Sequence, residues 1–171
     1  GWGADRSGNP HSGYTPECWL YSATDHRGKG GNMHDDTRAR LAILETLSRY
    51  AWSYDTRDLD LLRGCFTADG VFHATLAGHE GWGPFEGREA VVGWLADVMR
   101  TQNDQRRHCI SNVVFRELDA ARAVVDSYLL LTAVEDGALR VVCTGTYRDE
   151  LVREDDVWRI RRKVLALDNG F

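Results

Sequence analysis

The sequence has no long apolar run and no excess of basic residues, and each absence excludes a class of protein. No apolar stretch approaches the ~20 residues that a membrane-spanning helix requires. The 21 Lys and Arg residues are outnumbered by 26 Asp and Glu residues, which gives a net charge of −5. A nucleic-acid-binding protein normally has a basic face. We therefore expect a protein that neither enters a membrane nor binds nucleic acid.

The 4 cysteines lack the spacing of a disulfide framework or a zinc site. They form no CxxC pair and no Cys/His cluster, which is typical of reduced thiols in a cytoplasmic protein. We therefore expect a cytoplasmic protein without a metal site. Cys109 follows His108 directly, but adjacent residues on a strand point to opposite faces. This geometry disfavours a nucleophilic Cys–His pair.

Residues 1–34 differ from the rest of the 171-residue chain. They are rich in Gly, Ser, Asn and Asp and show neither helical nor strand periodicity, although they contain several aromatic residues. One interpretation is a flexible extension, or added sequence ahead of a native start at Met33. The other is a lid or partner-binding arm that lays its aromatic residues over a pocket. Residues 35–171 are long enough for one domain with a proper core.

Periodicity in residues 35–171 predicts helices first and long strands last. Helices are predicted over residues 35–54, 59–65 and 88–100, with Asp58 as the N-cap of the second. Strands are predicted over residues 71–73, 108–118, 123–134, 139–153 and 157–167, and a loop over residues 78–87. This order is typical of an α+β fold. We expect a curved antiparallel sheet wrapped around the first helix, with a blind pocket between the helix and the concave face.

Asp55 and His108 are the residues on which a chemical prediction can be based. Asp55 falls where the first helix ends, and His108 falls where a long strand begins. Taken alone, Asp55 fits a surface or capping carboxylate, and His108 fits a hydrogen-bonded structural imidazole. If the two meet beside Tyr50, the carboxylate, the imidazole and the phenol form a proton-transfer set that requires neither a metal nor an organic cofactor.

Several motifs from about Met33 onward resemble those of one family. They are Tyr50-x4-Asp55, His108-x3-Asn112, Gly145-Thr146-Tyr147-x-Asp149-Glu150 and Asp156-Val157-Trp158-Arg159-Ile160. Together they resemble the SnoaL-like branch of the nuclear-transport-factor-2-like (NTF2-like) superfamily, which includes dehydratases and a dehydrochlorinase. The resemblance implies an α+β fold, with a cone-shaped, curved antiparallel sheet around N-terminal helices. It also implies a homo-oligomer, either a dimer or a trimer.

The resemblance further implies roles for the residues of the first two motifs. His108 becomes the general base, Asp55 orients its ring, and Tyr50 polarises a carbonyl or protonates an oxygen leaving group. The predicted activity is that of a cofactor-independent dehydratase acting on a hydroxylated carbonyl or a polycyclic, polyketide- or steroid-like small molecule. One alternative is a polyketide cyclase or a ketosteroid-type isomerase with the same site. Another is a non-catalytic binding module, like the small subunit of a ring-hydroxylating dioxygenase.

Further residues are predicted to contact the substrate. Asn112 shares a strand face with His108. Lys163 lies where the dehydrochlorinase has an arginine and would hold an anionic group, although an exposed lysine in a basic strand end is an equal alternative. Ser127 and Tyr128 face opposite ways, and only one of them can face the pocket. The predicted substrate-binding residues are Asn112, Lys163, Trp52, Tyr54, Phe72, Trp82 and Tyr128, although each aromatic residue taken singly also fits the core.

Overall fold

The computed structural model describes residues 33–77 and 79–170, and within them the chain forms three helices and six strands. The helices are α1 (Met33–Thr56), α2 (Leu59–Cys65) and α3 (Arg88–Arg100). The strands are β1 (Phe66–Leu76), β2 (His79–Glu86), β3 (Gln105–Leu118), β4 (Arg122–Glu135), β5 (Ala138–Glu154) and β6 (Val157–Leu167). The extension predicted over residues 1–34 lies outside the described residues, except for its last two positions, which belong to α1.

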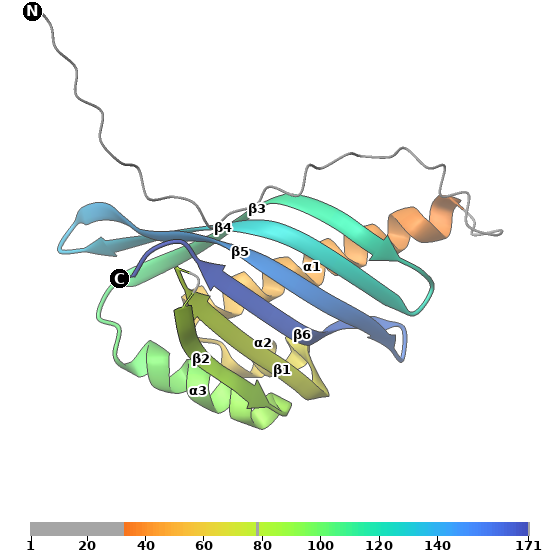
Figure 1. Ribbon diagram of the computed structural model, residues 1–171, viewed down its shortest axis with the longest axis horizontal. Coiled ribbons are helices and arrows are strands. Elements are labelled where there is room, and N and C mark those ends of the chain that lie inside the picture. The colour runs from red at the N-terminus through yellow and green to blue at the C-terminus, as the bar shows by residue number, and fades with distance from the viewer. Residues whose placement is uncertain (1–32, 78, 171) are drawn as a thin grey trace, which may run out of the picture. The chain divides into compact units, whose positions relative to one another are not determined.

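The six strands form one curled sheet in the order β2-β1-β6-β5-β4-β3 (Figure 1). Each strand from β3 to β5 pairs antiparallel with the next, which confirms the predicted meander. One pairing differs from the expected antiparallel sheet, because β1 runs parallel to β6. These two strands lie far apart in the sequence, and no hairpin fixes their relative direction.

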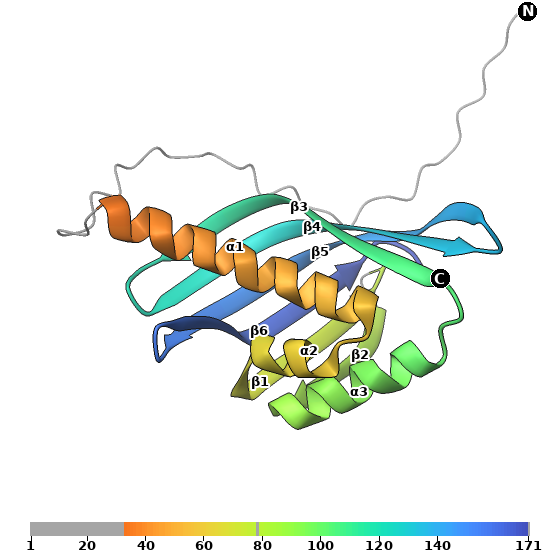
Figure 2. The same cartoon turned by 180° about the vertical axis from the view of Figure 1, so that it is seen from behind.

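The helices cover the concave face of this sheet, which confirms the α+β class. Figure 2 shows α1 lying across the longer strands and α2 and α3 lying beside each other near β1 and β2. The buried stripe of α1 is formed by Ile43, Leu47, Tyr50 and Tyr54, which recur at three- and four-residue intervals. Through this stripe, the C-terminal half of α1 packs against the concave face of the sheet.

The segment predicted as a loop over residues 78–87 contains a strand. β2 pairs antiparallel with β1, although the register shifts twice along the pair. Its glycines hide the alternating pattern on which a strand prediction depends, and Pro84 argues against a strand except at a sheet edge, where β2 lies. Gly81 is required by close backbone approach, because a Cβ atom there would collide with the carbonyl oxygen of Ala74.

A tight turn joins α1 to α2 and fixes where the side chains at the end of α1 point. Arg57 has a φ of 59°, and its N–H donates to the carbonyl oxygen of Tyr54 at 3.1 Å. The Asp58 N–H donates to the carbonyl oxygen of Ser53 at 2.9 Å. The Asp58 side chain then accepts the Leu61 N–H at 2.9 Å and caps α2, as the sequence predicted.

Replacing Asp58 by alanine should lower the free energy of unfolding by about 1 kcal/mol, because the Leu61 N–H loses its acceptor. Urea unfolding followed by circular dichroism measures this loss. Glu135→Ala is the control, because Glu135 is an exposed residue at the end of β4, and it should change the free energy by less than about 0.5 kcal/mol. Equal values for the two variants would show that α2 does not depend on its cap.

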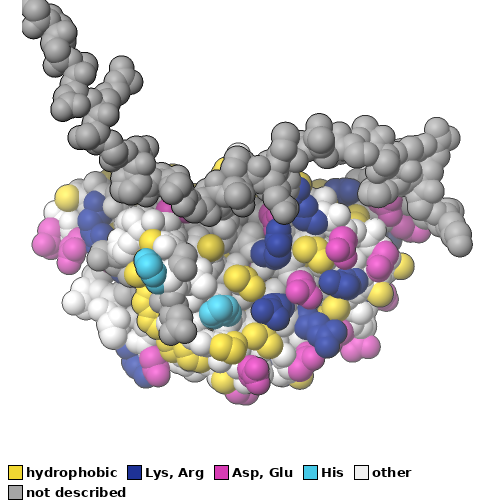
Figure 3. All heavy atoms as spheres, in the orientation of Figure 1, with side chains coloured by type: hydrophobic (Ala, Val, Ile, Leu, Met, Phe, Trp, Pro, Cys, Tyr) yellow, Lys and Arg dark blue, Asp and Glu magenta, His cyan; other side chains and the backbone are white. Residues whose placement is uncertain are grey.

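The convex face of the sheet carries charged side chains of both signs with apolar residues between them (Figure 3). Asp126 on β4 accepts hydrogen bonds from Arg116 on β3 and Arg148 on β5. Exposed apolar side chains of β4 and β5 are Leu130, Val134, Leu139 and Val141. The homo-oligomer and the cytoplasmic location stay predictions. Among the described residues, no helix is long and apolar enough to cross a membrane.

Candidate active site

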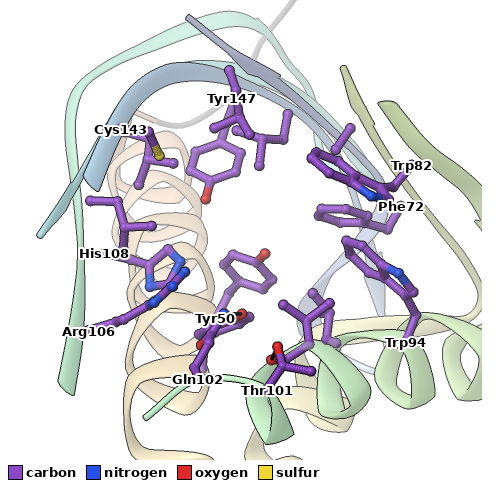
Figure 4. Close-up of a pocket in the computed structure, with 18 residues that line it drawn as sticks. Tyr50, Phe72, Trp82, Trp94, Thr101, Gln102, Arg106, His108, Cys143 and Tyr147 are labelled. Atoms are coloured by element: carbon purple, nitrogen blue, oxygen red, sulfur yellow. Dashed lines mark hydrogen bonds between the residues drawn. The ribbon is translucent and has the colours of Figure 1, made fainter. Parts of the chain in front are cut away.

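A cavity of about 350 Å³ lies between the concave face of the sheet, α1 and α3 (Figure 4). One wall is aromatic: the Trp94 ring lies 5.3 Å from the Phe72 ring and 4.5 Å from the Phe85 ring, and Trp82 lies beside them. The polar side chains of the lining gather on the opposite side and come from α1, from the segment after α3 and from two strands. They are Tyr50, Tyr54, Thr101, Gln102, Arg106, His108, Cys143 and Tyr147.

Asp55 and His108 meet at this polar side. Asp55 lies in the last turn of α1, and His108 is the fourth residue of β3. The Asp55 Oδ1 atom lies 2.6 Å from Nδ1 of the His108 ring, and Oδ2 accepts the backbone N–H of His108 at 2.9 Å. The two side chains are nearly buried, at 9% and 8% exposure. The structure thus brings together, across 53 positions of the chain, the pair that the family resemblance predicted.

This geometry fixes the orientation of the imidazole ring. A carboxylate oxygen only accepts, so in the neutral ring the Nδ1 atom carries the hydrogen and Nε2 has the free lone pair. Among residues 33–77 and 79–170, no side chain bonds Nε2, and the ring lines the cavity. The Tyr54 ring packs 4.5 Å from the imidazole and holds it in place. His108 is therefore oriented to accept a proton from a molecule in the cavity.

Two buried phenols face the same cavity. Tyr50 comes from α1 and Tyr147 from β5, and their rings lie 6.2 Å apart in an edge-to-face arrangement. Burial raises the pKa of Tyr50 and of Tyr147 well above the usual value of 10.0. Each phenol therefore keeps its hydrogen at neutral pH and can donate it to an oxygen atom. Sequence reasoning missed Tyr147, because its motif was read as a signature of the fold only.

Lys163, which was predicted to contact the substrate, lies behind these phenols and does not line the cavity. Its Nζ atom donates to both carboxylate oxygens of Asp149, at 2.9 and 3.0 Å, and both side chains are completely buried. The ammonium lies 4.2 Å from the Tyr50 ring centroid and 3.9 Å from that of Tyr147. The β5–β6 register pairs Asp149 directly with Lys163, which explains the contact.

Three more predicted substrate contacts do not reach the cavity. Trp52 is 68% exposed, because it lies two residues from Tyr50 and thus on the opposite side of α1. Tyr128 is 55% exposed on the convex face, and its neighbour Ser127 faces inward. Asn112 lies at a break in the β3–β4 register, has a φ of 52° and is exposed, so it no longer shares a face with His108.

The remaining predicted contacts, Tyr54, Phe72 and Trp82, line the cavity. Gln102 was not predicted, and its side-chain amide donates to the Tyr54 hydroxyl at 2.9 Å.

Burial raises the pKa of the Cys143 thiol, which is therefore a poor nucleophile at neutral pH. Within the part of the chain that the structure describes, no three His, Cys, Asp or Glu side chains cluster as metal ligands would. What the arrangement can do is transfer protons and donate hydrogen bonds to oxygen.

Comparisons with known proteins agree with this architecture. A family model described as "SnoaL-like domain" matches residues 35–164. A search of curated proteins gave no match. Rv3472, a function-unknown protein from Mycobacterium tuberculosis, is 27% identical with a TM-score of 0.71, over 82% of this chain and 78% of that one. Aln2 from a Streptomyces species is 26% identical with a TM-score of 0.66, over 77% and 91%. A Catenulispora acidiphila protein in complex with S-DNPA is 25% identical with a TM-score of 0.67, over 77% and 95%.

Proposed function

We propose that this chain, which belongs to the SnoaL-like domain family, is a cofactor-independent lyase that dehydrates a hydroxylated carbonyl compound. Family membership and the cavity indicate an enzyme or a binding protein for a small molecule. The observation that favours an enzyme is the nearly buried Asp55–His108 pair, whose imidazole faces the cavity. A binding site for an apolar molecule has no need of a buried, oriented base, since burial of polar groups costs free energy.

The proposed reaction is an acid–base β-elimination. His108 Nε2 takes the proton from the carbon α to the carbonyl, and Asp55 stabilises the imidazolium that forms. The C–H electron pair moves into an enolate, whose oxygen accepts a hydrogen bond from the Tyr50 or Tyr147 hydroxyl. The enolate then re-forms the carbonyl and the new C=C bond, while the β C–O bond breaks. The departing hydroxide takes the proton from the His108 imidazolium and leaves as water, which restores the neutral ring.

The lining of the cavity favours a flat, largely apolar substrate. Phe72, Trp82 and Trp94 form the aromatic wall, and aromatic side chains favour stacked or edge-to-face contact with a second ring. A volume of about 350 Å³ is at the small end for a ligand pocket. These features support a bicyclic or tricyclic ketone, in keeping with the polyketide- or steroid-like class. The C. acidiphila relative also holds a small molecule, S-DNPA.

The proposal is tested by incubating the protein with bicyclic and tricyclic β-hydroxy ketones in D2O. We expect loss of water, followed as enone absorbance, and deuterium at the α carbon, followed by NMR. Ketones with two methyl groups at the α carbon are the control and should not react. Exchange without loss of water would favour the isomerase or cyclase instead. Tight binding of these ketones without any exchange would contradict an enzymatic role and favour a binding module.

A further inference from the structure

A second cavity lies against the first, and Tyr54, Gln102 and Arg106 line both. It has a volume of about 350 Å³ and a mainly polar lining. Its other lining residues are Asp55, Thr56, Arg57, Asp104, Gln105 and Arg107. His108 lines the first cavity, whereas its partner Asp55 lines the second. The Asp–His pair therefore lies on the boundary between an apolar space and a polar space.

Two arginines of the second cavity donate to the backbone rather than to a carboxylate. Arg57 donates to the carbonyl oxygen of Gln102 at 2.7 Å, and Arg107 donates to the carbonyl oxygen of Arg106 at 2.8 Å. Among residues 33–77 and 79–170, neither guanidinium forms an ion pair with a carboxylate. Each is tied through one nitrogen to the backbone, and the rest of its planar fork remains able to donate to a bound oxyanion.

The two carboxylates of this cavity already accept hydrogen bonds from other residues. Asp55 accepts from the His108 ring and backbone. Asp104 accepts from Arg106 and from Arg140, each at 2.9 Å. The basic groups therefore outnumber the acidic groups around this space, in a chain whose net charge is −5. A local excess of positive charge in an acidic protein indicates a ligand with negative charge.

We propose that the second cavity binds a carboxylate or phosphate oxyanion carried by the substrate, through the guanidinium groups of Arg57 and Arg107. The substrate is then an amphipathic acid, with its ring system in the apolar cavity and its acidic group in the polar one. This inference rests on the proposed function in placing the reacting carbon between the two cavities, beside His108. Gln102 lies between the ring system and the acidic group of this substrate. Its side-chain amide donates to the Tyr54 hydroxyl, and its backbone carbonyl accepts from the Arg57 guanidinium.

Affinity measurements test the inference without requiring turnover. The probes are 2-naphthyl alkanoic acids of increasing chain length and the matching primary amides, titrated calorimetrically at low salt. We expect the best acid to bind about tenfold more tightly than its amide. Arg57→Gln combined with Arg107→Gln should remove this preference and leave the amide affinity unchanged, which also shows that the fold is intact. Arg162→Gln, an exposed arginine on β6, is the matched control and should keep the preference.

Inorganic phosphate distinguishes an oxyanion site from a general effect of charge. It should compete with the acid, should not compete with the amide, and should lose its effect in the double arginine variant. Equal binding of acid and amide at every chain length would overturn the inference, as would a preference that survives the double variant. Phosphate binding at the arginines would also overturn it if the naphthyl acids bind no more tightly than their amides. Since this assay measures affinity alone, its failure leaves the dehydration experiment unaffected.

Discussion

Replacing His108 by glutamine should lower kcat/KM for dehydration by about 10²- to 10⁴-fold, the usual contribution of a positioned general acid–base group. Glutamine has a similar length but no basic nitrogen. The fold should survive, because Asp55 Oδ2 accepts the backbone N–H of residue 108, at 2.9 Å in the wild type, and this N–H remains in the variant. The measurement is the initial rate of enone formation with the best β-hydroxy ketone. The loss should appear in kcat, because the apolar contacts that bind the ketone are unchanged.

Variants of Asp55 test whether catalysis depends on the Asp55–His108 pair or on His108 alone. Asp55→Asn keeps the shape of the side chain but removes the charge that stabilises the imidazolium, and a large loss of kcat is expected. Combining Asp55→Asn with His108→Gln should cost little more than His108→Gln alone, because residues that act as a unit are not additive. His73→Gln, on β1, is the histidine control and should retain activity. A loss smaller than about tenfold in His108→Gln would contradict the assignment of the base.

The pairing of Asp55 with His108 could be predicted because local patterns place each residue well and a family resemblance joins them. The helix signal ends near Asp55, and the strand signal begins near His108, so both lie at element ends. Their meeting depends on tertiary structure, which periodicity does not describe. Without the resemblance, the structural interpretation of each residue alone would have been favoured.

Three of the site predictions that differ from the structure depend on features that local strand patterns do not fix. Strand alternation shows that Ser127 and Tyr128 point to opposite faces, but not which face is inside. The break in the β3–β4 register changes the orientation of Asn112 and has no signal in the sequence. Pairing of Lys163 with Asp149 depends on the register between two strands, which local patterns do not fix. For Tyr128, Asn112 and Lys163, the inward face and the register of the strands are therefore what the local sequence patterns did not fix.

Replacing Lys163 by methionine should lower the free energy of unfolding by about 3–5 kcal/mol, because Asp149 then remains buried without a partner. Urea unfolding monitored by tryptophan fluorescence measures the loss. Arg148→Met removes an exposed arginine from its ion pair with Asp126 and is the matched control, expected to cost about 1 kcal/mol or less. Replacing both partners, as Lys163→Met with Asp149→Leu, should recover most of the loss, since an apolar pair leaves no buried charge unpaired.

The pH dependence of the Lys163→Met variant identifies the unpaired carboxylate as the cause. Burial raises the pKa of Asp149 above its usual value of 3.8, and the Lys163 charge opposes that rise. Removing the lysine raises the folded-state pKa further, and the folded variant then binds a proton more tightly than the unfolded chain. Its stability should therefore increase, relative to the wild type, as pH falls through the raised pKa toward the unfolded value. If the variant lost the same free energy of unfolding at neutral and at mildly acidic pH, the loss would be assigned to packing around Tyr50 and Tyr147 instead.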